Sequence, residues 1–526
     1  MKKRNITRYI FAWAVYFGLA STAALTSCND WLTAHPEDDI VDDDYWHNGD
    51  QVQSVVTSCY RWLADASCLE RMIVWGELRS DNVEAGSAAS SEERNIMDVN
   101  VLSSNGLASW DCFYKVINIC NNVIKKAPHA METDANYRED EMQANVAEAL
   151  TIRALCYFYL VRAFGDVPYV TEPSASESTD YNLPQSSADE IVIPALIADL
   201  ERAIPMARSA WSTTEETKGR ITRNAVRALL ADIYLWAGRY SECIATCDAI
   251  LNDPTSNLKL VEGEHYINKV FYEGVSDESI FELVYETNAL TSTTIQSKYG
   301  NPSQNLSAHA VATMLFYNEG FTYNPEMTDT IADLRGIGSM TYSTGTHPIF
   351  KYTGQTPGTF SNYHSSSSYT WRNASSQANW IVYRLSDVYL MKAEALANIA
   401  TTQAQVDEVA ALCNLTYRRA TMGQDTLSHD LFGIGQASRN QVLQERRREF
   451  CFEGKRWFDL LRRIRQDGNP DYSLQLMGNR YSSDKDASLK TTKLRHLGAW
   501  YMPVYSNQMS INKNLHQNDY YQAQEK

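Results

Sequence analysis

The sequence predicts an all-α fold of tetratricopeptide-like helix pairs that carries a large, loop-rich and partly β insertion. Apolar residues recur at helical spacing through most of the chain. Residues 252–380 lack this period and are rich in Asn, Ser, Thr, Gly and Tyr. Small residues stand at close-packing positions in successive helix pairs: Ala149 and Ala154, Ala228 and Ala231, Ala393 and Ala397. The spacing between these pairs is irregular, which excludes a regular solenoid.

The first strong helical patterns cover residues 111–126 and 143–164. The second pattern should end at Gly165-Asp166-Val167-Pro168, because glycine and proline stop helices. Ser187 followed three residues later by Glu190 forms a capping box and predicts that a helix starts there and runs to about 207. Further helices are predicted over 223–238, 240–251, 384–399, 404–420 and 439–465.

The insertion contains one strand-like segment and one long loop. Residues 278–285 alternate between apolar and polar side chains as a strand does. Residues 353–378 are rich in Ser, Thr and Gly and also carry Phe360, Tyr363, Tyr369 and Trp371. A loop of this length in a compact chain is usually functional or disordered.

The amino terminus has the pattern of an export signal. Lys2, Lys3, Arg4 and Arg8 precede an apolar run from Tyr9 to Leu25. The run ends in Leu25-Thr26-Ser27-Cys28, which resembles a bacterial lipobox and implies cleavage before Cys28 and acylation of its sulfur. The alternative is an ordinary signal cleavage that leaves Cys28 unmodified. A second apolar run of about 18 residues is not found, so we expect anchoring by lipid alone.

These patterns predict five regions. Residues 1–27 are the signal peptide and 28–48 an acidic lipid tether. Residues 49–251 form an N-terminal helical part, 252–380 the insertion and 381–526 a C-terminal helical part. The net charge of −17 makes the chain a poor candidate for holding phosphate backbones, so no nucleic-acid partner is expected.

The remaining cysteines do not predict a disulfide framework. Nine are left besides Cys28, an odd number, and most stand in apolar helical patterns. The local pairs Cys59 with Cys68, Cys112 with Cys120, and Cys243 with Cys247 remain open to test.

Several segments together resemble the SusD/RagB family of outer-membrane lipoproteins. The segments, in order, are Cys28-Asn29-Asp30-Trp31-Leu32, residues 147–168 (AEALTIRALCYFYLVRAFGDVP), 219–238 (GRITRNAVRALLADIYLWAG), 379–420 with YRLSDVYLMKAEAL, 445–460 (ERRREFCFEGKRWFDL) and the end from Tyr501-Met502-Pro503-Val504 to Tyr520-Tyr521. The resemblance implies a SusD-like, surface-facing protein of the outer membrane. Its implied partners are an oligosaccharide or polysaccharide ligand and a SusC-like TonB-dependent transporter.

One departure from the family concerns the ligand. Some relatives that bind starch-like glycans carry an aromatic residue after the segment that corresponds to Arg79-Ser80-Asp81-Asn82. Here the chain runs from Asn82 to Ser109 without one, which puts starch in doubt.

The chemistry of a sugar then points to candidate ligand residues. A sugar ring has an apolar C–H face and a rim of hydroxyls, so its site needs a flat aromatic ring beside polar side chains. The insertion supplies both, and Tyr363, Tyr369 and Trp371 rank highest because their segment is the most polar and least periodic; Tyr299 follows. Asp81 and Asn82 are a second candidate, since they follow a helix end and open a long loop. The alternative is that most of these rings only pack the insertion onto the helices.

Catalytic, metal and cofactor sites are not predicted. Adjacent acids such as Glu92-Glu93 suit solvation better than catalysis, and the ten His show no metal-ligand spacing. The charges of 445–456 are interpreted as intrahelical pairs, Glu445 with Arg448 and Glu449 with Arg446.

Three functional hypotheses follow, with non-enzymatic glycan capture first. A peptide-capturing homologue would favour a deep, charged cavity over an exposed aromatic platform. A secreted all-α glycosidase would need a cleft lined by two carboxylates.

Overall fold

The computed structural model describes residues 45–174, 182–286, 290–300, 304–309, 333–340, 347–355, 370–372 and 377–523. The chain divides into residues Met1–His47 and a compact unit, Asn48–Lys526, and the description below concerns the second. Cys28, Tyr363 and Tyr369 lie outside the described residues.

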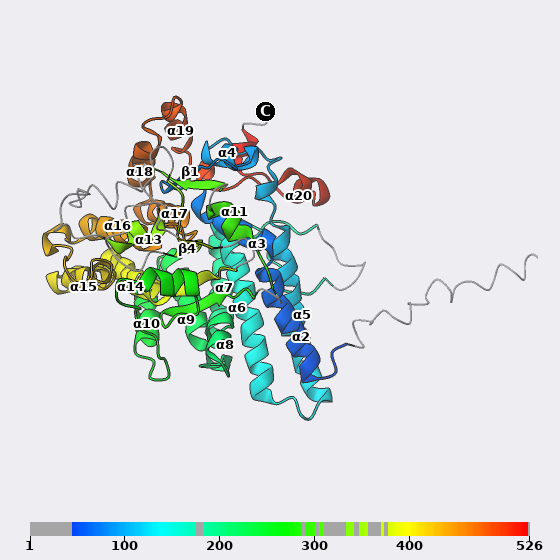
Figure 1. Ribbon diagram of the computed structural model, residues 1–526. Coiled ribbons are helices and arrows are strands. Elements are labelled where there is room, and N and C mark those ends of the chain that lie inside the picture. The colour runs from blue at the N-terminus through cyan, green and yellow to red at the C-terminus, as the bar shows by residue number, and fades with distance from the viewer. Residues whose placement is uncertain are drawn as a thin grey trace, which may run out of the picture. The chain divides into compact units, whose positions relative to one another are not determined.

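Helices make up most of the compact unit, and the all-α fold class is confirmed (Figure 1). The N-terminal helices are α2 (Gly49–Leu63), α3 (Ala66–Glu77), α4 (Ser91–Met97), α5 (Asp111–Thr133), α6 (Glu139–Phe164), α7 (Ile193–Met206), α8 (Thr214–Gly219), α9 (Arg223–Trp236) and α10 (Tyr240–Leu251). The C-terminal helices are α14 (Leu385–Ile399), α15 (Gln403–Ala420), α16 (Gln436–Phe450), α17 (Arg456–Asp467), α18 (Asp471–Tyr481), α19 (Ala487–Lys493), α20 (Ser506–Ile511) and α21 (Asp519–Gln522).

Short strands and helices form the described part of the insertion. The strands of the fold are β1 (Val83–Ala85), β2 (Ser279–Leu283), β3 (Leu306–Ala308), β4 (Gly354–Gln355), β5 (Thr370–Trp371) and β6 (Trp380–Arg384), and the insertion's helices are α11 (Thr294–Tyr299) and α13 (Leu334–Ser339). The strands pair as three antiparallel ladders, β1 with β3, β2 with β6 and β4 with β5. The predicted strand is confirmed as β2, although all five of its residues are buried.

The local signals in the sequence explain where most helices begin and end. Asn48, Ser90, Thr213 and Thr402 each accept a hydrogen bond from the backbone N–H three residues on, in complete capping boxes. Ser187 accepts from the Glu190 N–H as predicted, and a single π turn, Ala188–Val192, precedes α7. Helix α6 ends before Gly165, whose φ of +77° suits glycine.

Helix α6 lies at the centre of the N-terminal helices. Among the described helices, α6 alone has the length and hydropathy to cross a membrane, but its apolar window is fully buried inside the unit. It packs against α2, α5, α7 and α9. Because its apolar window is buried, we interpret α6 as a core helix.

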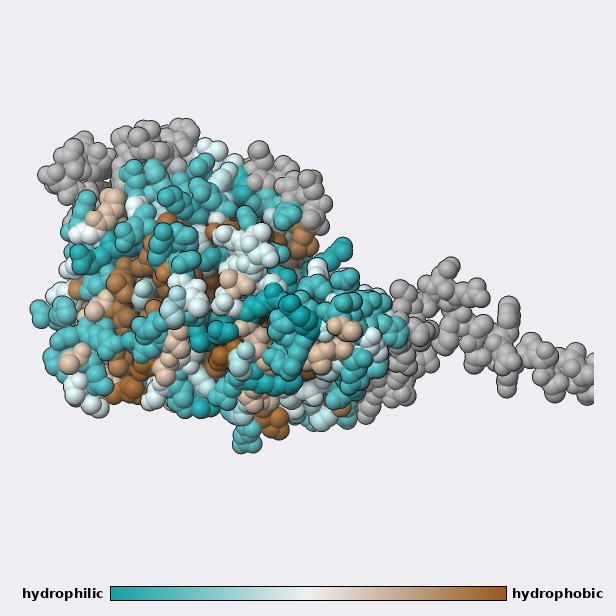
Figure 2. All heavy atoms as spheres, turned by 90° about the horizontal axis from the view of Figure 1, so that it is seen from below, coloured by the Kyte–Doolittle hydropathy of each residue, from teal (hydrophilic) through white to brown (hydrophobic). Residues whose placement is uncertain are grey.

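On the face of the molecule drawn in Figure 2, hydrophobic residues form patches among hydrophilic ones.

The predicted continuous helix over 439–465 is wrong. The structure has two helices, α16 and α17, separated by a turn in which Phe452 and Gly454 have φ of +66° and +69°. The turn is tightly packed, because the Gly454 carbonyl oxygen lies against Gly76 of α3 and leaves no room for a Cβ there. Charged residues run through both helices and favoured one continuous helix, and Gly454 is the signal in the sequence that marks the break.

Candidate ligand-binding surface

The insertion is joined to the C-terminal helices by a buried strand pair. In β2 and β6, Ser279 is opposite Arg384 and Leu283 is opposite Trp380. The chain passes from Arg384 directly into α14. The strand pair therefore sets the insertion beside α14 to α16 with little freedom of position.

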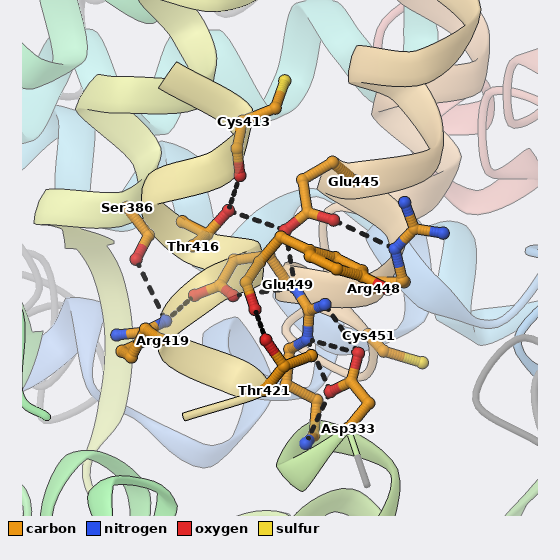
Figure 3. A network of polar contacts seen from close by, with 12 residues as sticks. Asp333, Ser386, Cys413, Thr416, Arg419, Thr421, Glu445, Arg448, Glu449 and Cys451 are labelled. Carbon is orange, nitrogen blue, oxygen red and sulfur yellow. Dashed lines mark hydrogen bonds and ion pairs between the residues drawn. The ribbon is translucent and has the colours of Figure 1, made fainter. Parts of the chain in front are cut away.

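Glu449 of α16 is the centre of a buried ion network at this junction (Figure 3). Arg335 from the insertion and Arg384 from β6 place their Nη1 atoms 3.2 Å and 2.6 Å from its carboxylate oxygens. Arg419 of α15 forms a third ion pair with the same carboxylate. Burial alone would raise the pKa of Glu449, but Arg419, Arg384 and Arg335 hold it well below its ordinary value.

Glu445, one turn earlier on α16, extends the network. It accepts hydrogen bonds from Arg335 Nη1 at 2.7 Å and from Thr416 Oγ1 at 2.6 Å. Its pair with Arg448, at 2.9 Å, is the intrahelical pair that the spacing predicts. The other predicted pair is not the one formed, since Arg446 pairs with Asp459 at 2.9 Å across to α17. The charges are buried and mostly join different elements, whereas the sequence suggested pairs along one helix.

Glu453 closes the network on the side of the insertion. Its carboxylate lies 2.7 Å from Arg384 Nη2 and 2.6 Å from the Nζ of Lys351. Burial opposes ionisation, yet Arg384 and Lys351 lower the pKa of Glu453 to about 2. Lys351 also donates to the backbone carbonyls of Glu449 and Cys451. Charges of both signs thus tie Arg335 and Lys351 of the insertion to the end of α16 and the turn that follows it.

A cluster of aromatic rings lies next to Lys351. Tyr352 stacks on Trp380 with ring centroids 5.3 Å apart, and Phe271 meets Tyr352 edge to face at 5.0 Å. Phe350 is fully buried and contacts the ring of Trp371 edge to face at 5.3 Å. Trp371 is thereby backed by a rigid apolar layer.

Trp371 itself is half-buried, on the short ladder in which it is opposite Gly354. Arg372 follows it, also half-buried, and its guanidinium lies 4.1 Å from the ring centroid of Tyr272. Arg372 donates to the Tyr352 carbonyl at 3.2 Å, which fixes the side chain, and burial lowers its pKa. We call Tyr272, Trp371 and Arg372 the aromatic surface. It combines two partly exposed rings with a cation.

Comparison with known proteins places this architecture in a family. The family model described as "SusD family" matches residues 265–521, and the model described as "Starch-binding associating with outer membrane" matches residues 30–235. The chain belongs to the SusD/RagB family. The predicted resemblance is confirmed.

Two relatives of this SusD/RagB protein are distant in sequence but match over most of their length. The SusD-like protein P38 of Formosa agariphila is 24% identical over 476 residues, 84% of this chain and 90% of its own. A SusD-like protein of Bacteroides ovatus is 22% identical over 91% of this chain and 88% of its own.

Solved structures share the fold. A SusD superfamily protein of Bacteroides vulgatus matches with a TM-score of 0.70 and 20% identity over 90% of this chain and all of its own. Surface glycan-binding protein A of Bacteroides thetaiotaomicron, solved with laminarihexaose, matches with a TM-score of 0.65 and 18% identity over 89% of this chain and 99% of its own.

In this SusD/RagB protein, Asp81 and Asn82 are fully buried. Asp81 pairs with Arg456 at 2.8 Å, and Asn82 accepts a hydrogen bond from Arg447 at 2.9 Å. Although burial opposes it, Arg447 and Arg456 lower the pKa of Asp81. The two residues join the end of α3 to α16 and α17, so the structure corrects the expectation that they open a surface loop and reach ligand.

Tyr299 is also interior. Its side chain is fully buried at the end of α11, where it packs against Phe452 with ring centroids 6.5 Å apart. Burial raises the pKa of its hydroxyl well above the ordinary value. For Tyr299 the structure therefore agrees with the alternative stated from the sequence, in which the ring only packs the insertion onto the helices.

Sequence reasoning missed Tyr272 as a neighbour of Arg372. Tyr272 stands in the turn Asn268–Glu273, about a hundred residues earlier. A polar loop without periodicity gives no register, so nothing in the sequence paired it with residue 372.

Two further observations describe what the site can hold. Within the described part of the chain, no group of three or more His, Cys, Asp or Glu is placed to bind a metal ion. One cavity between α6, α9, α14 and α17, lined by Arg162, Asp232 and Lys455 among others, has a volume of about 20 Å³. That volume suits a single water and not a sugar ring.

Proposed function

We propose that this protein is a cell-surface, lipid-anchored glycan-binding protein of the outer membrane. It captures oligosaccharides without cleaving them and passes them to a SusC-like TonB-dependent transporter. Membership of the SusD/RagB family supports this function, as do the outer-membrane association in the description of one family model and the laminarihexaose complex of a structural relative.

The observation that carries the proposal is the position of Trp371. Its side chain is half-buried, and its ring contacts Phe350 edge to face, so the ring is held while part of it faces solvent. A ring of this kind can stack on the C–H face of a sugar. Tyr363 and Tyr369 stand in the same segment of the sequence, and we propose that they add to the surface.

The anchor follows from Cys28. We propose that acyl chains on its sulfur hold the protein at the membrane while the acidic tether leads to α2. Lipid attachment keeps a weakly bound oligosaccharide at high effective concentration beside the transporter. Labelled palmitate should enter the protein in cells, and Cys28→Ala should abolish both the labelling and the sedimentation with membranes.

Affinity electrophoresis tests the binding function. The chain from Asn29 onward, run through gels that contain different polysaccharides, should be retarded by at least one glycan and release no reducing sugar. Trp371→Ala should lose most of the retardation, whereas Trp62→Ala should not. Trp62 is a matched control because its ring is 37% exposed but lies on α2, outside the insertion.

Three results would contradict the proposal. Unchanged retardation of Trp371→Ala would show that Trp371 does not contribute to the glycan-binding site. Release of reducing sugar by the pure protein would favour a glycosidase. Retention of peptides but of no glycan would favour a peptide importer.

A further inference from the structure

Gly354 lies opposite Trp371 in the short ladder of β4 and β5. Opposite residues of an antiparallel ladder send their side chains to the same face, so a side chain at position 354 would be the direct neighbour of Trp371. The φ of Gly354 is not positive, so its backbone conformation does not require glycine. The reason for a glycine at this position therefore lies in the space around it.

The ring of Phe350 fills the space beside Gly354. A Cβ added to Gly354 would lie 1.9 Å from Cε2 of Phe350 and 2.3 Å from its Cδ2, far inside carbon–carbon contact distance. The same ring meets Trp371 edge to face, with centroids 5.3 Å apart and planes at 84°. Phe350 thus occupies the place of the missing side chain opposite Trp371. Covering a glycine of a sheet by an aromatic ring also stabilises the pairing of the strands.

A tight turn brings Phe350 over Gly354. The carbonyl of Phe350 accepts hydrogen bonds from the N–H groups of Thr353 and Gly354, both at 3.0 Å. The second bond spans four residues, the spacing at which the side chains of a helical turn lie one above the other. Tyr352 has a φ of +69°, which is uncommon for a residue other than glycine, and its ring is held by stacking on Trp380. The turn therefore has a fixed shape.

Phe350 has little room to move away from an added Cβ. Its side chain is 0% exposed, and its N–H donates to the carbonyl of Ser339 at 2.7 Å. The next residue, Lys351, is paired with Glu453 at 2.6 Å, so the backbone is held on both sides of Phe350. A ring in a close-packed interior can yield only by displacing its neighbours. Trp371 is one of these neighbours, so a change at position 354 acts on Trp371.

We propose that Gly354 and Phe350 are positioning residues that set the ring of Trp371 for stacking on a glycan. The purpose of this arrangement rests on the proposed function, but the contacts among the three residues do not. Phe350 supports the ring of Trp371, and Gly354 leaves the space that Phe350 needs. A side chain at position 354 would displace Phe350 and change the position of the Trp371 ring.

Fluorine NMR of the mature chain, labelled with 5-fluorotryptophan, tests the positioning without any ligand. The Trp371 resonance is the one that Trp371→Phe removes. Gly354→Ala and Phe350→Leu should each shift this resonance, and Gly49→Ala should leave it unchanged. Gly49 is a matched control, because it begins α2, outside the insertion, and a Cβ there would lie 2.7 Å from Cδ2 of the Tyr137 ring. An unshifted Trp371 resonance in both Gly354→Ala and Phe350→Leu would overturn the proposal.

Glycan affinity tests what the positioning does. With a glycan identified by affinity electrophoresis, Gly354→Ala and Phe350→Leu should each bind more weakly than wild type, up to the roughly tenfold loss expected for a missing stacking ring. Leucine lacks the Cε2 and Cζ atoms that crowd position 354. Gly354→Ala should therefore weaken binding less in the Phe350→Leu background than in the wild type, because the two residues are in contact. Gly49→Ala should keep the wild-type affinity.

Circular dichroism confirms that each variant is folded, and Phe350→Leu decides the question if Gly354→Ala does not fold. Wild-type affinity in Gly354→Ala or in Phe350→Leu, or the same loss from Gly354→Ala in both backgrounds, would overturn the positioning role. A wild type that binds no glycan would contradict the proposed function, and the fluorine resonance would still decide whether Gly354 and Phe350 position Trp371.

Discussion

The Nη1 atom of Arg384 lies 2.6 Å from Oε1 of Glu449, and both side chains are 1% exposed. Arg384 ends the strand that leaves the insertion, and Glu449 belongs to the helix that the insertion packs against. This pair, with Arg335 and Arg419, holds the loop-rich part of the chain on the helical scaffold.

Glu449→Gln should therefore destabilise the protein strongly. The change leaves three buried guanidinium groups without a shared counter-charge, which costs about 3–5 kcal/mol. Urea unfolding measures the free energy. Glu242→Gln is the control, because Glu242 pairs with Arg239 while both side chains are more than 40% exposed, and should change stability by less than about 1 kcal/mol. Equal effects of the two substitutions would contradict the role of burial.

The buried carboxylates predict loss of stability in acid. The pKa values of Glu453 and Asp459 are lowered to about 2 despite their burial, by Arg384 and Lys351 and by Arg446 and Arg462 respectively. In the unfolded chain these groups titrate near 4, so the unfolded state binds protons first as pH falls. Their contribution is present above about pH 4 and is lost as pH falls toward 2. A free energy of unfolding that stays constant between pH 4.5 and 2.5 would contradict this.

The pKa of Glu77 is raised and not lowered, so Glu77 changes the pH dependence of stability in the opposite direction. Burial raises its pKa to about 7, although hydrogen bonds from Asn82, Ser80 and the Gly454 N–H oppose the shift. The folded state therefore holds a proton that the unfolded state releases near pH 4.5, and stability falls as pH rises from about 4.5 to 7. Glu77→Gln mimics the protonated form and should remove this part of the pH dependence, worth a few kcal/mol at pH 7. A slope that is the same in wild type and variant would refute the protonation of Glu77.

Two glycines should respond in opposite ways to alanine. A Cβ on Gly76 would lie 1.7 Å from the Gly454 carbonyl oxygen, so Gly76→Ala should destabilise by more than about 2 kcal/mol. Gly478 stands inside α18 with nothing within 4 Å of the added Cβ, so Gly478→Ala should stabilise by about 0.5–1 kcal/mol. Thermal or urea unfolding compares the two, and a loss of stability in both would show that the space around Gly478 is not free.

The scaffold could be predicted from the sequence because its helices depend on local patterns. The spacing of Phe113, Val116 and Cys120 predicted α5, and the structure extends that helix to Thr133. The helix start at Ser187 and the helix end at Gly165 were also predicted from signals within a few residues of each position. The break between α16 and α17 was missed because charged residues continue through it and the single stop signal, Gly454, was not given weight.

The candidate site could be predicted only in part, for a physical reason. The polar, non-periodic segment made Trp371 a candidate, and its side chain is half-buried in the structure. The other described candidates, Asp81, Asn82 and Tyr299, are fully buried. Their burial depends on partners far along the chain, such as Arg447 and Arg456 for Asp81. Residue type and loop position cannot reveal such partners.

Isothermal titration of the mature chain with an oligosaccharide identified by affinity electrophoresis tests the central claim most directly. Wild type and Trp62→Ala should bind with the same affinity, and Trp371→Ala should bind roughly tenfold more weakly, as expected for the loss of one stacking ring. The intact oligosaccharide should be recovered after the titration. Equal affinity for Trp371→Ala and wild type, or recovery of a cleaved product, would contradict the account.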